Sequence, residues 1–188
     1  MKRFAVACAL VACLLNLSCQ SAVKTGESTA LTGIDLVAMT EDMATQIAAD
    51  ADVNAAIASR GALKVVVQPV VNQLRAEIIP SGQATAFTGR VRVLLSKHAP
   101  DRFTWIMNRD AFYALRSREL DINPGPSPDA VNPDYALTAT FSSLGDENSR
   151  RREQFYVCAF ELTNLQDRTL LWAGSYEVKK TAVKGFLD

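Results

Sequence analysis

Residues 154–179 have the sequence QFYVCAFELTNLQDRTLLWAGSYEVK, and this stretch decides the fold. Two runs rich in aromatic and β-branched residues flank Gln166 to Thr169, four polar residues that favour a turn. The pattern predicts a long antiparallel hairpin. Both alternating sets of side chains are apolar in the first arm, so we expect that arm inside a sheet. The second arm alternates apolar and polar residues, which favours a position nearer an edge.

Helices and short strands alternate in the rest of the predicted fold. Predicted strands span residues 63–71, 103–106 and 135–144, and predicted helices follow Thr32, span 52–59, extend from Ser81 to about Lys97 and follow Asn108. With the hairpin, this order predicts an α/β (α+β) fold in which helices pack on a mixed sheet of about five strands.

Apolar residues at helical spacing predict which helix faces are buried. Thr32 and Asp35 have the spacing of a capping box before the first helix. The residues expected to face the core are Leu36, Met39, Met43 and Ile47 in the first helix, Phe87, Val91, Leu94 and Leu95 in the third, and Phe112, Leu115 and Leu120 in the fourth.

The first residues have the pattern of a secretory signal. Lys2 and Arg3 precede an apolar run from Phe4 to Leu15, which is too short to span a membrane, since a transmembrane helix needs about 20 apolar residues. The run ends at Leu17-Ser18-Cys19-Gln20, which resembles the lipobox of bacterial lipoproteins. That resemblance implies residues 1–18 as a lipoprotein signal peptide and an acylated Cys19 as the first mature residue.

Two alternatives to acylation at Cys19 stay open. Cys13, after Leu10-Val11-Ala12, fits the lipobox better but follows an unusually short apolar run. An ordinary signal cleaved near Ala22 would leave no lipid. Because Gln20 is not the aspartate that resembles an inner-membrane retention signal, we expect a lipid anchor in the outer membrane, on its periplasmic face.

Composition separates a tether from a folded domain. Residues 19–30 are mostly small and polar, so we expect a flexible tether, followed by a globular domain over residues 31–188. Basic and acidic residues number 20 each, and this balance favours neither nucleic acid nor an anionic membrane as a partner. Of the four cysteines, Cys158 alone lies in the domain, where we expect a buried core thiol.

The sequence offers few groups for catalysis. His98 is its only histidine, so no cluster of metal ligands, no Ser-His-Asp site and no cofactor is expected, and no glycine-rich phosphate loop is present. Asp146 and Glu147 are the candidate carboxylate pair for general acid and base catalysis on glycans. Arg150, Arg151 and Arg152 are candidates for contact with a partner, although a solvated turn also explains them. The proline-rich segment 121–134 is either a recognition motif or a connector.

Several segments together resemble the LpoB family of outer-membrane lipoproteins. They are the helix with Met39 and Met43, the strand from Val65 to Asn72 with Ile78 following, Tyr135-Ala136-Leu137-Thr138, and the hairpin from Phe155 to Lys180 with Asn164-Leu165 and Leu171-Trp172-Ala173. The resemblance implies a domain like the N-terminal domain of TolB and a non-catalytic protein that activates a class A penicillin-binding protein. Two features depart from the family: the tether is much shorter, and the turn at 166–169 lacks a Thr-Gly pair.

Two other functions remain as alternatives. One keeps the fold in an accessory lipoprotein of an outer-membrane secretion or assembly system, similar to curli-export or flagellar lipoproteins. The other is an enzyme that acts on envelope glycans, which the scarcity of candidate catalytic residues disfavours.

Overall fold

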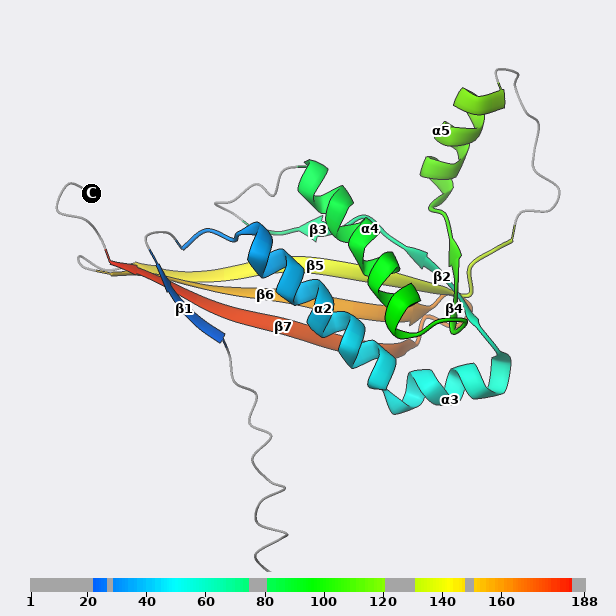
Figure 1. Ribbon diagram of the computed structural model, residues 1–188, viewed down its shortest axis with the longest axis horizontal. Helices are drawn as coiled ribbons and strands as arrows, with labels where there is room; N and C mark the ends of the chain where they lie inside the picture. Colours follow the sequence, from blue (N-terminus) through cyan, green and yellow to red (C-terminus); the bar gives the residue numbers. More distant parts are fainter. Residues whose placement is uncertain (1–21, 27–28, 75–80, 121–130, 148–150, 184–188) are drawn as a thin grey trace, which may run out of the picture.

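Strand β6 (Arg151–Asn164) lies inside the sheet, as its apolar sequence predicts (Figure 1). It pairs antiparallel with β5 (Tyr135–Glu147) on one side and with β7 (Leu170–Val183) on the other. Phe160, for example, lies between Ala139 of β5 and Gly174 of β7. The predicted hairpin is therefore the β6–β7 pair. The computed structural model describes residues 22–26, 29–74, 81–120, 131–147 and 151–183.

The turn of this hairpin is held by its own polar side chains. Asn164 Oδ1 accepts a hydrogen bond from the Gln166 N–H, and Asp167 Oδ1 accepts bonds from the backbone N–H and the hydroxyl of Thr169, at 2.9 and 2.6 Å. These bonds from Thr169 lower the pKa of the Asp167 carboxyl. The turn thus forms without glycine, and Arg168 takes the left-handed position with a φ of 66°.

The parallel part of the sheet follows on the far side of β5. Strand β2 (Leu63–Val67) pairs with β5, and β4 (Phe103–Ile106) pairs with β2. The predicted strand 63–71 is interrupted, because Pro69 cannot donate to a ladder, and the chain resumes pairing with β5 in β3 (Val71–Asn72). The described sheet has the order β1-β7-β6-β5-β2-β4, with β3 beside β5 as a seventh strand, so two short strands add to the expected five.

The N-terminal strand corrects one expectation and confirms another. Strand β1 (Ala22–Gly26) pairs in parallel with Val178 to Ala182 of β7. The prediction of a flexible tether over residues 19–30 is therefore wrong for these five residues. The expectation that β7 lies nearer an edge than β6 is confirmed, since only β1 lies outside β7 and covers its last third.

Helices α2 (Gly33–Ala49) and α4 (Ser81–His98) lie side by side over one face of the sheet (Figure 1). The capping box of Thr32 and Asp35 is confirmed. The predicted inward residues of both helices pack in one core with alternate residues of the strands: Met39, Met43, Ile47, Phe87, Val91, Leu94, Leu95, Leu137, Phe141, Tyr156, Cys158, Phe160, Leu162, Trp172 and Val178, with Leu36 at its margin. On the opposite face of β6, Phe155, Val157 and Ala159 are only half-buried.

The two remaining helices lie at the end of the sheet where β5 begins (Figure 1). Helix α3 (Ala51–Arg60) is capped by Asp50 and ends at Gly61, whose φ of 79° suits glycine. Helix α5 (Arg109–Leu120) follows Asn108, whose side chain accepts a bond from the Asp110 N–H as expected for a cap. The structure buries no residue of α5, so the prediction that Phe112, Leu115 and Leu120 face the core is wrong.

Two substitutions in β5 test this one-sided core. Phe141 is 1% exposed and its ring meets that of Phe87 edge-to-face at 5.3 Å, whereas Leu144 is 75% exposed. We expect Phe141→Ala to lower the free energy of unfolding by about 3–5 kcal/mol and Leu144→Ala by no more than about 0.5 kcal/mol. Urea unfolding followed by circular dichroism measures both values. Equal losses would show that the helices do not cover the face on which Phe141 lies.

Candidate functional site

The site residues predicted from sequence do not come together in one place. Cys13, Cys19 and Arg150 lie outside the described residues. Arg151 and Arg152 form the start of β6, and Arg152 is exposed and lies opposite Glu147 of β5 and Ala182 of β7. The basic run therefore enters a strand rather than forming only the turn that was the simpler expectation. Of the proline-rich segment, the structure describes residues 131–134, where the Asp134 N–H donates to Lys64 O and its carbonyl accepts from Leu165 N–H.

A buried ion pair joins the start of α2 to the end of β7, and the sequence analysis missed it. Lys180 Nζ lies 2.8 Å from Asp35 Oδ2, and the two side chains are 7% and 1% exposed. Lys180 Nζ also donates to the carbonyl oxygen of Ala30. The same Asp35 oxygen accepts bonds from the backbone N–H and the hydroxyl of Thr32, at 2.9 and 2.8 Å. One carboxylate thus caps the helix and fixes the chain entering it.

This pair binds the N-terminal part of the chain to the sheet. Lys180 follows Trp172, Tyr176 and Val178 in strand alternation, so its position in the sequence already indicated the core face. A buried lysine is unfavourable unless a charge pairs with it, and Asp35 supplies that charge. That Asp35 is the partner of Lys180 was not predictable, because the capping box already accounted for an aspartate at position 35.

A second polar cluster bridges the outer sides of α2 and α4. Arg90 donates from Nη2 to Glu41 Oε1 at 2.6 Å and from Nε to the buried Thr40 hydroxyl at 2.9 Å. His98 Nε2 lies 3.5 Å from the other Glu41 oxygen, at the helix end where the sequence placed it. The cluster links the two helices. Because its charged side chains are half-exposed, it adds little to stability.

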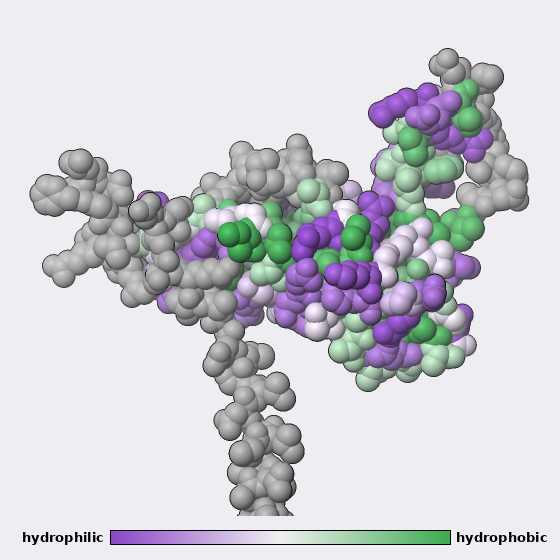
Figure 2. Space-filling model, in the orientation of Figure 1, coloured by the Kyte–Doolittle hydropathy of each residue, from purple (hydrophilic) through white to green (hydrophobic). Residues whose placement is uncertain are grey.

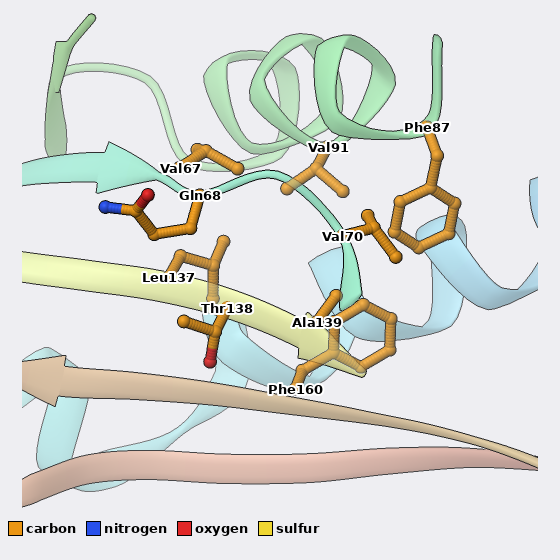
Figure 3. Close-up of a pocket in the computed structure, with 9 residues that line it drawn as sticks. All are labelled: Val67, Gln68, Val70, Phe87, Val91, Leu137, Thr138, Ala139 and Phe160. Carbon is orange, nitrogen blue, oxygen red and sulfur yellow. The ribbon is translucent and has the colours of Figure 1, made fainter. Parts of the chain in front are cut away.

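The pocket found between β2, α4 and β5 is too small for a ligand (Figure 3). Its volume is about 10 Å³, which is roughly the space of one water molecule. Figure 3 shows it between Phe87 and Val91 of α4 and Leu137 of β5. Its walls are mainly aliphatic and aromatic, so this space is a gap in the core where Pro69 interrupts the strand.

Two other features are absent from the described residues, namely a cluster of metal ligands and a membrane-spanning helix. No group of three or more His, Cys, Asp or Glu side chains in that part of the chain is placed to hold a metal ion. None of the described helices is both long and apolar enough to cross a membrane.

Comparison with known proteins finds likeness only among solved structures. No protein-family model and no curated protein matches this sequence. The C-terminal domain of LpoB from Escherichia coli is 14% identical, with a TM-score of 0.44 over 77% of this chain and 98% of that chain. The corresponding domain from Salmonella enterica is 15% identical, with a TM-score of 0.41 and the same coverage.

A third similar structure is the lipoprotein GNA1162 from Neisseria meningitidis. It is 14% identical, with a TM-score of 0.31 over 67% of this chain and 85% of that chain. At TM-scores below 0.5, these likenesses carry no inference about function. What the chain does must be argued from its own residues.

Replacing Lys180 tests the importance of the buried pair. Lys180→Met leaves the Asp35 carboxylate buried without its cation, so we expect a loss of about 3–5 kcal/mol in the free energy of unfolding. Lys179, one residue earlier, pairs with Glu153 at 2.5 Å on the half-exposed face. Lys179→Met is the matched control and should cost about 1 kcal/mol or less. If both variants lose the same amount, the Asp35–Lys180 pair is not a main constraint.

Cys158 should behave as a core residue. It is fully buried, and burial raises the pKa of its thiol well above the ordinary value of 9.0. We expect iodoacetamide to alkylate it only after unfolding, as measured by mass spectrometry of the peptide that contains it. Above about pH 9 the unfolded chain loses this proton while the folded chain keeps it, so stability should fall as pH rises. Rapid alkylation of the folded protein would contradict the placement of β6.

Proposed function

We propose that this protein is an envelope lipoprotein that acts by binding another protein, and that its partner is a class A penicillin-binding protein. The proposal makes it a non-catalytic regulator of peptidoglycan synthesis at the periplasmic face of the outer membrane. One observation carries it: a lipobox-like sequence at Cys19 stands three residues before the first strand of a domain built from motifs that resemble the LpoB family.

Several residues that carry the resemblance lie in the core of the domain. Met39 and Met43 are fully buried on the inner face of α2, Val65 and Tyr135 pair across β2 and β5, and Trp172 covers the core from β7. These motifs support a shared scaffold. A scaffold alone does not specify a partner, which depends on the surface residues placed on it.

The position of β1 determines how far the domain can move from its membrane. Only Gln20 and Ser21 separate Cys19 from Ala22, so the chain between them spans at most about 11 Å. An acylated Cys19 would therefore hold the edge of the sheet close to the lipid as long as β1 stays paired. Under this proposal the synthase must extend toward the outer membrane to meet the domain.

Activation needs no chemistry from the regulator. A protein that binds the active conformation of a synthase about 1.4 kcal/mol more tightly than the resting one shifts the equilibrium about tenfold. We propose Arg150, Arg151 and Arg152 as contact residues, because Arg152 is exposed at the start of β6.

The short distance from Cys19 to β1 favours a second candidate function. An accessory lipoprotein of an outer-membrane secretion or assembly system meets a partner in its own membrane, so it needs no long tether. This candidate shares the lipid anchor and the protein-binding role and differs only in the partner.

Reconstitution with the organism's own class A synthases tests the proposal. The acylated protein in detergent should raise the rate of lipid II polymerisation severalfold, and replacing Arg150, Arg151 and Arg152 together by Gln should weaken the effect. Replacing Lys97 by Gln on α4 is the control for a general charge effect, since Lys97 is also exposed. No stimulation by any class A synthase, together with co-purification of an outer-membrane channel, would favour the second candidate.

Mass spectrometry of the mature N-terminus tests the anchor separately. We expect a diacylglyceryl-modified Cys19 as the first residue. An unmodified terminus at Gln20 or beyond would contradict the anchor, and acylation at Cys13 would lengthen the span before β1.

A further inference from the structure

The outer edge of β7 is covered over only part of its length. Strand β1 pairs with β7 from Val178 to Ala182. From Trp172 to Glu177, β7 pairs with β6 on its inner side, and no other described strand pairs with its outer side. Among the described strands, β1 alone pairs with this edge, and the edge beside it, from Trp172 to Glu177, is open.

The direction of the backbone groups on this open edge follows from the rest of the sheet. Leu137 O and Phe141 O accept bonds from the N–H groups of Gln68 and Gln73, so odd-numbered residues of β5 turn their backbone groups away from β6. Because these groups alternate along each antiparallel strand, the even-numbered residues of β6 and β7 bond to each other. The backbone N–H and C=O groups that point outward from the open edge belong to Ala173, Ser175 and Glu177, and all three residues are exposed.

One contact confirms this direction. Gln46 of α2 donates from Nε2 to the carbonyl oxygen of Ser175, at 3.4 Å. Gln46 Nε2 also donates to Asp42 at 2.5 Å, so its bond to Ser175 is the longer of the two. A side-chain amide thus occupies one position that a strand would fill, through a bond that a better donor can replace.

The side chains beside the open edge indicate what kind of strand fits. On the helix-covered face, Tyr176 is half-buried beside the open edge, whereas Trp172 is only 6% exposed and belongs to the core. On the opposite face Glu177 and Glu161 of β6 are exposed, and the nearest lysine, Lys179, is paired with Glu153. A strand that alternates apolar and basic residues complements both faces, and no proline or lysine of β7 blocks its approach between Trp172 and Glu177.

We propose that the edge of β7 from Ala173 to Glu177 binds an extended segment of a partner protein, which adds to the sheet next to β1. The partner segment alternates apolar residues beside Tyr176 with basic residues beside Glu177. Backbone hydrogen bonds provide affinity in this mode, and the alternating side chains provide specificity. The inference goes beyond the proposed function, because it concerns the form of the bound segment and holds for a synthase or for any other envelope protein.

A fluorescein-labelled peptide of alternating valine and lysine serves as the probe for binding to the full-length chain in detergent. Ser175→Pro removes one outward N–H and places a ring on the edge, without removing a bond to β6. We expect it to weaken binding roughly tenfold or more. Ser175→Ala keeps the backbone N–H and should bind like the wild type. Fluorescence anisotropy measures the affinities, and circular dichroism checks the fold of each variant.

A second arm changes the peptide instead of the protein. N-methylation of alternate peptide amides removes the hydrogen bonds that those amides donate to the edge and keeps the charge of the peptide. The methylated peptide should therefore bind wild-type protein as weakly as the unmodified peptide binds Ser175→Pro. Equal binding of the two peptides, or unchanged binding by a folded Ser175→Pro variant, would overturn the proposal. It would also be overturned if no binding occurs at millimolar peptide. Concentration-dependent dimers that Ser175→Pro abolishes would instead assign the edge to a second copy of the chain.

Discussion

Tyr156, Cys158, Phe160 and Leu162 lie on the same face of β6, and burying that face determines where the other elements lie. Strands β5 and β7 complete the backbone hydrogen bonds of β6 on both sides, and α2 and α4 cover the apolar face. Since the helices cover one face only, the other carries half-buried residues and charges such as Glu161. The domain therefore has a closed core and an open sheet surface, as an α+β layer requires.

This closed core has consequences for function. The cavity of about 10 Å³ between β2, α4 and β5 has the space of about one water molecule, and exposed surfaces are the other places where the described residues can meet a partner. They include the open edge of β7 and helix α5, which projects from the sheet and exposes both hydrophobic and hydrophilic residues (Figure 2). The buried Asp35–Lys180 pair fixes the segment before α2 on β7, next to β1. Strand β1 and the open edge thus lie along the same side of β7.

Strand alternation predicted β5, β6 and β7, because each long strand carries its own pattern, but it did not indicate which face of β6 is buried. Helix periodicity predicted α2 and α4 and most of their buried apolar residues. Strand β1 could not be predicted, because Ala22–Gly26 has little apolar character and its pairing depends on β7, far away in the sequence. The pattern of α5 predicted a buried face, yet no described element covers it. The Asp35–Lys180 pair was also missed, since Asp35 already had a role as the cap of α2.

The central claim is that β6 is hydrogen-bonded on both sides while the outer side of β7 is unpaired from Ala173 to Glu177. Native-state hydrogen exchange, measured for each backbone amide, tests this claim most directly. The account predicts that amides of β6 between Tyr156 and Leu162 exchange slowest. Within β7 it predicts alternation, with fast exchange at Ala173, Ser175 and Glu177 and slow exchange at Gly174 and Tyr176. Uniform protection from Ala173 to Glu177 would contradict it, because another segment would then already cover the edge.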